Sequence, residues 1–175
     1  MSSVAHFLEE MEYVLKPVMQ TIDRAILMIP AAALDFKPSE RCMSVAELAI
    51  HIYRGCYFLS LGIKKGRFTE NDFELQPPLA EELSSPEEIV RYGEKVKEVF
   101  QEVISHLTNE DLERLIQFDF TKAKERHFAH GWGKWTIKGS DCLRIILVES
   151  LHHRGQLSSY LRIMGLRPPH IYPPL

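Results

Sequence analysis

Glu149 and His153 are the two residues whose types and spacing are most typical of a metal site. They lie four residues apart in an apolar, helix-like pattern, and this spacing places both side chains on one face of a helix. A carboxylate and an imidazole placed in this way can bind one divalent cation. A helix that must bury most of its surface has little other use for two such groups, because unpaired polar groups are costly to bury. The alternative interpretation is an ordinary helix pair without a metal ion.

A third ligand has to come from another helix, and His51 is the best candidate. It lies between Leu48 and Ile52 in a strongly apolar stretch, and Gly55 one turn later leaves space beside it. Two histidines and one glutamate leave an open coordination position for water or substrate, as in catalytic metal sites. A hydrogen-bonded histidine in the core is the alternative interpretation of His51.

Several residues after His153 could take part in binding or catalysis. Arg154, Gln156 and Tyr160 follow it on the same predicted helix, and they are candidates for orienting a substrate or the metal ligands. His152 is turned about 100° from His153 around the helix, so we expect it at the edge of the cavity.

Two tryptophans precede that helix. Trp132 and Trp135 could form a wall or lid of the site, or they could pack over the end of the helices. The remaining histidines are expected at the surface, although two of them could reach the cavity from the segment before the last helix. They are His6, His106, His127, His130 and His170, of which His127 and His130 are the two in that segment.

Apolar residues at three- and four-residue spacing predict the helices that position these groups. Ser44 and Glu47 form a capping box at the start of the helix that carries His51. Gly165 ends the last helix, and Pro17 should kink or divide the first one. Four long helices are predicted over residues 3–28, 45–63, 86–106 and 140–164, with a short helix over 108–116.

The least regular part of the sequence is the segment 117–137, which has no sustained helical period. We expect a long crossover with some extended structure there, and a hairpin is one form that it could take. The predicted fold class is therefore all-α: an up-down four-helix bundle with a short extra helix and an irregular crossover before the last helix. No repeat, low-complexity tract or linker divides the sequence, so residues 1–175 are expected to form a single domain.

Composition excludes several classes of protein. The 175 residues are 45% hydrophobic and 26% charged, which is typical of a globular protein. The net charge of −3 and the absence of a basic patch argue against nucleic-acid binding. The apolar stretch 25–34 is too short to span a membrane. The acidic N-terminus does not resemble a signal peptide, so we expect a cytoplasmic protein.

Three cysteines occur without a CxxC spacing, which argues against a disulfide framework and favours a reducing compartment. Cys56 or Cys142 could act as a nucleophile, but this is the weakest of the enzymatic hypotheses, because buried cysteines usually behave as small apolar residues. The sequence contains no phosphate-binding loop, dinucleotide fingerprint or GxSxG motif.

The chain resembles the DinB-like, or DinB/YfiT, superfamily of four-helix-bundle metalloenzymes over nearly its full length. Three segments carry the resemblance, in this order: Ile29-Pro30 with Leu34-Asp35-Phe36-Lys37-Pro38; Met43-Ser44-Val45-Ala46-Glu47-Leu48-Ala49-Ile50-His51-Ile52; and His152-His153-Arg154-Gly155-Gln156-Leu157 with Tyr160-Leu161-Arg162 and Gly165.

The resemblance implies a divalent metal bound by one histidine of the second helix and two histidines of the last. The matching positions are His51, residue 149 and His153, so Glu149 departs from the usual three-histidine set. Zn, Ni, Mn and Fe all remain candidates, and the carboxylate shifts the preference modestly toward Mn or Fe. The resemblance also implies an open coordination site and a homodimer. Some relatives are thiol transferases that use a low-molecular-weight thiol such as bacillithiol or mycothiol.

These observations predict a divalent-metal-dependent enzyme that acts on a small molecule. It would be a thiol transferase or a hydrolase in which the metal lowers the pKa of a bound thiol or water. The alternative function is a non-enzymatic metal- or ligand-binding protein of a stress response. Neither function calls for a nucleic acid or a membrane as partner.

Overall fold

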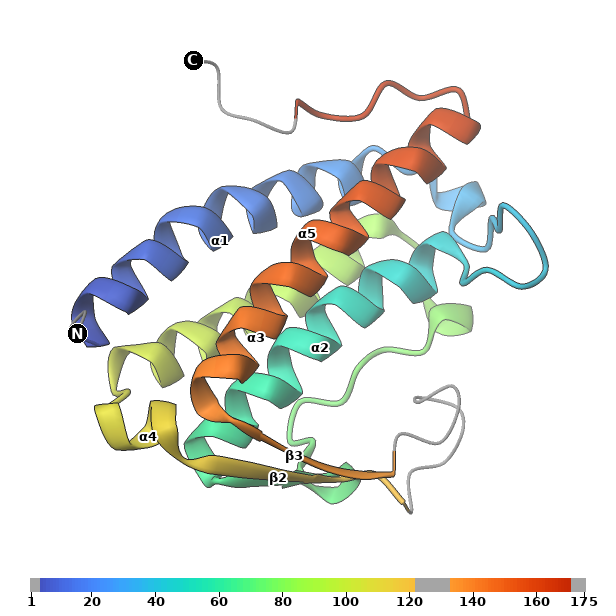
Figure 1. Cartoon of the computed structure of the whole chain (residues 1–175). Helices are drawn as coiled ribbons and strands as arrows, with labels where there is room; N and C mark the ends of the chain where they lie inside the picture. The colour runs from blue at the N-terminus through green and yellow to red at the C-terminus, as the bar shows by residue number, and fades with distance from the viewer. Residues whose placement is uncertain (1–3, 122–132, 171–175) are drawn as a thin grey trace.

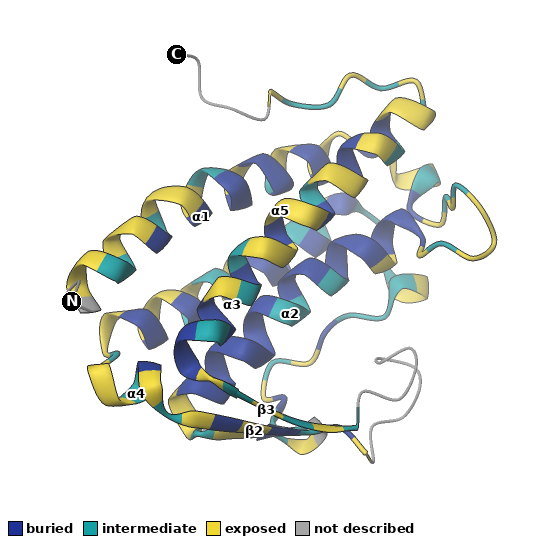
Figure 2. Cartoon of the chain, in the orientation of Figure 1, coloured by how far each residue is buried: buried dark blue, intermediate teal, exposed yellow. Residues whose placement is uncertain are grey.

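Four long helices form most of the structure (Figure 1). The structure is a computed structural model that describes residues 4–121 and 133–170. The buried faces of the helices turn toward one another, while the outer faces of α1 and α5 are exposed (Figure 2). Pro17 does not divide the first helix. The four helices, all predicted from the apolar spacing, are α1 (Val4–Leu27), α2 (Val45–Lys65), α3 (Pro86–Ser105) and α5 (Gly139–Ile163).

Both ends of α2 are capped. The Ser44 hydroxyl accepts a hydrogen bond from the Glu47 backbone N–H at 3.1 Å, and the Glu47 carboxylate accepts one from the Ser44 N–H at 2.5 Å. This is the predicted capping box. At the other end Gly66 adopts a φ of 74°, which favours glycine, and its N–H reaches the Gly62 carbonyl. The caps set the limits of α2 and hence the place of His51 along it.

α2 and α3 run in the same direction, so the predicted up-down order is wrong at this step (Figure 1). The Tyr53 ring lies against Gly93 in the middle of the pair. Near the ends of the same two helices, Lys64 forms an ion pair of 2.7 Å with Glu102. The physical reason is the long connection 66–85, which returns the chain along the helices before α3 begins.

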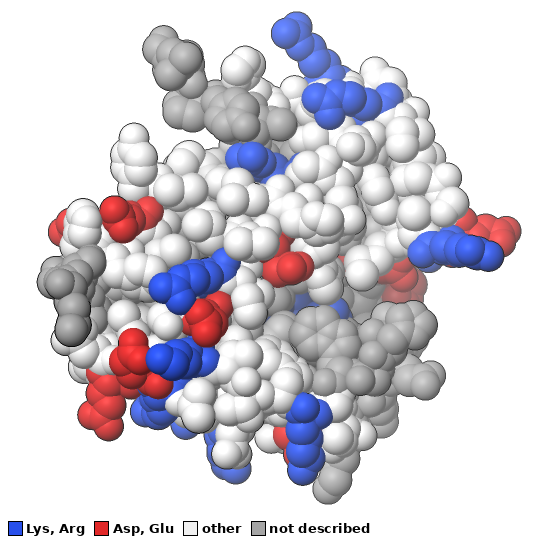
Figure 3. All heavy atoms as spheres, viewed as in Figure 1, with Lys and Arg blue, Asp and Glu red and all other residues white. Residues whose placement is uncertain are grey.

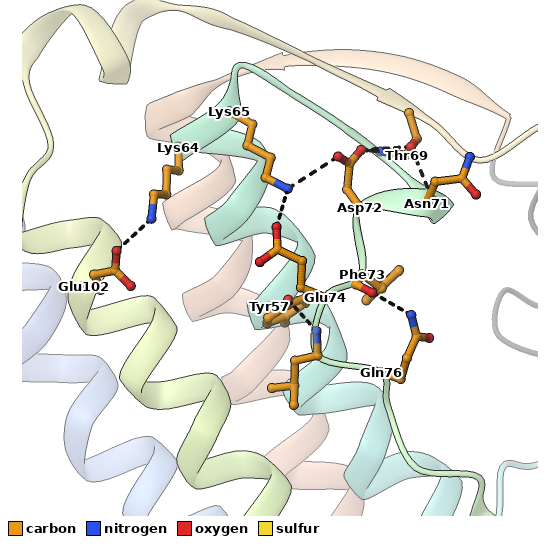
Figure 4. Close-up of polar contacts among 11 residues, drawn as sticks. Tyr57, Lys64, Lys65, Thr69, Asn71, Asp72, Phe73, Glu74, Gln76 and Glu102 are labelled. Carbon is orange, nitrogen blue, oxygen red and sulfur yellow. Dashed lines mark hydrogen bonds and ion pairs between the residues drawn. The ribbon is translucent and has the colours of Figure 1, made fainter.

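Polar contacts hold this connection against α2 (Figure 4). The Lys65 ammonium group donates to the carboxylates of Asp72 at 3.4 Å and Glu74 at 3.0 Å. Closer to the middle of α2, the Tyr57 hydroxyl accepts a hydrogen bond from the Leu75 backbone N–H at 2.9 Å. The return path of the chain is therefore fixed by contacts with α2 itself.

A small three-stranded sheet lies at one end of the helices, so the predicted all-α class is wrong in this respect. The short helix α4 (Asn109–Glu113) ends earlier than predicted because residues 115 and 116 belong to a strand. In that strand Ile116 and Phe118 are buried while Leu115 and Gln117 are exposed, and this alternation is typical of a strand. The sheet has the order β1 (Arg67–Thr69), β2 (Leu115–Asp119), β3 (Lys134–Lys138), with β1 parallel and β3 antiparallel to β2.

The strands β2 and β3 confirm the expectation of extended structure within the described part of 117–137. Their register places Phe118 opposite Trp135, and the two rings stack with centroids 4.1 Å apart and planes at 10°. Since β3 leads directly into α5, this pairing fixes the start of the helix that carries Glu149 and His153.

One partly buried polar contact joins three of the helices. Tyr53 of α2 donates a hydrogen bond to Asp23 of α1 at 2.6 Å, and Lys97 of α3 donates to the other carboxylate oxygen at 2.5 Å. Burial raises the pKa of Tyr53 well above its usual value, so the phenol keeps its proton and continues to donate. Because the buried Tyr53 hydroxyl would be costly to leave without a partner, this contact favours the observed arrangement of the three helices.

Charges of both signs are interspersed on the surface (Figure 3). On the face shown, Lys and Arg side chains lie next to Asp and Glu side chains at the lower edge, and much of the centre is uncharged. Among the described helices, none combines the length and the hydropathy that crossing a membrane requires.

Candidate metal centre

The side chains of His51 from α2 and of Glu149 and His153 from α5 converge at one place. One potential ligand atom from each residue lies within 4.8 Å of the other two. The imidazole rings of His51 and His153 have centroids 4.7 Å apart and are nearly perpendicular, at 87°. Within the described ranges, this is the one group of three His, Cys, Asp or Glu side chains with such spacing. The three predicted ligands are therefore brought together by the packing of α2 against α5.

His153 is the most buried of the three, and both of its ring nitrogens face oxygen atoms. Nδ1 lies 2.7 Å from Gln156 Oε1, and Nε2 lies 3.0 Å from Glu149 Oε2. A neutral imidazole carries one N–H and can donate to only one of these oxygens. With that proton on Nδ1, the Nε2 lone pair points toward the carboxylate. A cation between Nε2 and Glu149 would satisfy both groups, and Gln156 would orient the ring.

His51 is half-buried, and its surroundings favour the neutral form. Burial lowers its pKa to about 4, and the nearby charges of Arg54 and His153 act in the same direction. A neutral imidazole is the form that binds a metal ion.

One contact of His51 disfavours the binding of a metal ion. Arg54 Nη2 lies 3.1 Å from His51 Nδ1, and because arginine only donates, Nδ1 accepts this hydrogen bond. Metal binding through Nε2 requires the proton on Nδ1, so Arg54 has to turn away from the ring when an ion binds.

The donor set fits a divalent cation. Two imidazole nitrogens and one carboxylate are ligands that Zn, Ni, Mn and Fe all accept. Exposure of the side chain increases from 10% for His153 to 53% for Glu149. The set therefore has a buried side, which the protein fills, and an exposed side, which leaves coordination positions for water or a substrate.

A cavity of about 290 Å³ adjoins the three side chains. It lies between α2 and α5 and is bordered by Trp135 of β3, whose indole ring is held by its stacking on Phe118. Apart from the three candidate ligands and Ser150, the described residues of its wall are apolar. The other wall residues are Ile52, Gly55, Cys56, Phe58, Leu59, Ile145 and Ile146.

Comparison with known proteins identifies the family. The model of the DinB family matches residues 1–175. The chain belongs to the DinB family. Among solved structures it is similar to the DinB-like protein YjoA of Bacillus subtilis, with a TM-score of 0.70 and 21% identity over 94% of this chain and 99% of that one. It is also similar to a DinB-like protein of Bacillus cereus, with a TM-score of 0.67 and 20% identity over 94% and 97% of the two chains. No curated protein matches the sequence.

The other predicted site residues of this DinB-family protein take different positions. Gln156 contacts a candidate ligand directly, and His152 is exposed beside the site, its ring 4.9 Å from that of His153. Tyr160 instead donates a hydrogen bond to the Met43 carbonyl at 3.1 Å, in the loop before α2. Tyr160 and Arg154 are both absent from the cavity wall, so of the three candidates for substrate or ligand orientation only Gln156 touches the centre.

Trp135 lines the cavity and also packs on the sheet, so both interpretations of this residue hold. Trp132 lies outside the described residues, as do His127 and His130. The prediction of surface positions is confirmed for the histidines that the structure describes away from the centre, which are His6, His106 and His170.

The cysteines do not offer a nucleophile at this centre. Cys56 lines the cavity, but burial raises its pKa to about 12. Burial raises the pKa of Cys142 to about 12 as well. Both thiols therefore stay protonated near neutral pH, which disfavours the hypothesis of cysteine nucleophilic catalysis.

Two residues of the centre were not anticipated from the sequence. Arg54 contacts His51 from three residues away on α2, and this helical spacing could have indicated the contact. Ser150, which is buried in the cavity wall, has no comparable signal, because its position depends on how α5 is rotated against α2.

Proposed function

We propose that this DinB-family protein is a metal-dependent enzyme built on a four-helix bundle, with one divalent ion bound by His51, Glu149 and His153. The observation that carries the proposal is the convergence of these three side chains beside a cavity of about 290 Å³. A structural metal site is usually closed by a fourth protein ligand, whereas a catalytic site keeps a position open. The described residues supply three such ligands beside a space for a small molecule, and this favours the catalytic type.

Two reaction classes agree best with this arrangement. One is the transfer of a thiol to a small molecule, and the other is the hydrolysis of a small molecule. When bound, the ion would lower the pKa of a coordinated thiol or water and so supply a nucleophile near neutral pH. Gln156 would accept a hydrogen bond from Nδ1 of the metal-bound His153, and the apolar walls around Trp135 would surround the body of the substrate. The thiol would be a separate low-molecular-weight molecule, because Cys56 remains protonated.

The first test is metal analysis of the purified, untagged protein after loading with Zn, Ni, Mn or Fe. We expect about one equivalent per chain, and a loss of affinity of more than about tenfold in each of His51→Ala, Glu149→Ala and His153→Ala. His152→Ala is the matched control, because His152 is an exposed neighbour that the proposal leaves out of the ligand set. All variants should keep their helical circular dichroism.

The outcomes separate the possible functions. Unchanged metal affinity in the three ligand variants would overturn the proposed centre. If metal binds as expected, transfer of bacillithiol or mycothiol to small electrophiles is assayed with the loaded protein. Metal binding without turnover of thiol or ester substrates would favour the non-enzymatic binding function instead.

A further inference from the structure

Gly55 is a glycine in the interior of α2 that close packing does not require. A Cβ atom added there would meet no heavy atom within 4 Å. At two other helix glycines the result is different, since a Cβ at Gly62 would lie 2.5 Å from the Phe118 ring and one at Gly93 would lie 2.4 Å from the Tyr53 ring. Glycine in a helix interior is less stable than alanine. At Gly55 the loss of helix stability is accompanied by empty space and not by closer packing between two elements.

The space left by Gly55 is part of the cavity beside the candidate metal centre. Any larger side chain at this position would extend from α2 into the open volume. The glycine therefore helps to keep the cavity open, and Trp135 and the two imidazoles also line it.

The cavity wall has a chemical preference. Among the described residues that line it, Glu149 and the two histidines are the only titratable groups besides the protonated thiol of Cys56, and Ser150 adds one hydroxyl. Within the part of the chain that the structure describes, the lining contains no lysine or arginine. A phosphate or carboxylate on the body of a ligand would find no opposite charge among these side chains, and its desolvation would be costly. The wall favours an uncharged, apolar body.

The volume sets the size of that body. An apolar protein cavity of about 150 Å³ holds one benzene molecule. The cavity here has about 290 Å³, which suffices for two fused rings or for one ring with a short chain. The flat indole of Trp135 and the branched side chains of Ile52 and Ile146 are suitable contacts for a ring system.

We propose that this cavity binds the body of a neutral, apolar small molecule of one or two rings, and that Gly55 keeps the space for it. The ligand would direct a single polar head group toward His51, Glu149 and His153. This orientation rests on the proposed metal-dependent function, whereas binding of the apolar body does not require the ion.

The test uses two probes of the same shape and the full-length, metal-free protein. 2-Naphthol is neutral at neutral pH, and 6-hydroxy-2-naphthoate carries an added carboxylate at the far end of the ring system. Isothermal titration should show saturable, one-site binding of 2-naphthol and binding of the naphthoate that is weaker by more than about tenfold. Equal affinities of the wild-type protein for the two probes would overturn the proposal. The absence of saturable 2-naphthol binding would overturn it as well.

A matched pair of variants locates the binding site. Gly55→Leu fills the cavity and should weaken 2-naphthol binding by more than about tenfold. Gly155→Leu is the control, because Gly155 is an exposed glycine of α5 whose added Cβ also meets nothing within 4 Å and which does not line the cavity. Gly55→Ala, which adds a single methyl group, serves as a second variant if the leucine prevents folding, and it should weaken binding by a smaller factor. Unchanged binding in a folded Gly55→Leu protein would contradict the proposal.

The result is independent of the metal proposal. If the protein binds 2-naphthol as expected but no metal, the cavity assignment stands and the metal-dependent function fails. If it binds metal through the three candidate ligands but not 2-naphthol, the metal centre stands and the assignment of the cavity fails.

Discussion

Replacing Gln156 with leucine should weaken metal binding although no ligand is removed. Gln156 Oε1 lies 2.7 Å from His153 Nδ1, so leucine deletes the oxygen that can accept a hydrogen bond from Nδ1 when Nε2 binds the ion. The net contribution of such a hydrogen bond is about 0.5–1.5 kcal/mol. Loss of an orienting partner of a metal-bound histidine costs about 10–100-fold in affinity. Because Gln156 is exposed and water can replace part of the contact, we expect the lower end, about tenfold or 1.4 kcal/mol.

The assay for this prediction is competition for Zn²⁺ with a chromophoric chelator near neutral pH. Gln156→Glu should bind at least as tightly as the wild type, because a carboxylate accepts the same hydrogen bond from Nδ1. Ser159→Ala is the control, since the Ser159 hydroxyl donates only to the Gly155 carbonyl of its own helix, at 3.1 Å. If Gln156→Leu binds Zn²⁺ within about twofold of the wild type while His153→Ala loses it, the contact with Gln156 does not orient the ligand.

Two further predictions concern His51. Its pKa is about 4 in the folded protein and about 6.5 in an unfolded chain, so the unfolded state takes up the proton first as the pH falls. The metal-free protein should therefore lose up to about 3 kcal/mol of its free energy of unfolding between pH values of about 6.5 and 4, as measured by urea unfolding. An equally steep loss in His51→Gln would show that the titration of His51 is not the cause. Arg54→Gln should tighten Zn²⁺ binding by up to about tenfold, because a glutamine oxygen can accept the Nδ1 proton that metal binding at Nε2 requires. Unchanged or weaker binding in a calorimetric titration would show that Arg54 does not oppose the ion.

The local features of the fold could be predicted because their causes are local. The apolar spacing predicted the four long helices, and the Ser44–Glu47 box predicted where α2 begins. The direction of α3 could not be predicted, since it depends on the path of 66–85 and on contacts such as that of Tyr57 with Leu75. The parallel pairing of β1 with β2 joins residues 67–69 to 117–119, and pairing over such a separation leaves little trace in either segment.

In the candidate centre, too, some features follow from the local sequence and others depend on tertiary packing. The sequence alone determined that Glu149 and His153 share a helix face, because four residues are close to one helical turn. It also identified His51 as the best partner on another helix. Only the tertiary structure decided that α2 packs on α5 with the two imidazoles 4.7 Å apart, that Arg54 reaches His51, and that the space at Gly55 becomes a cavity rather than being filled. Helical periodicity determines which side chains share a face, whereas the rotation and direction of neighbouring helices are set by the packing of the whole core.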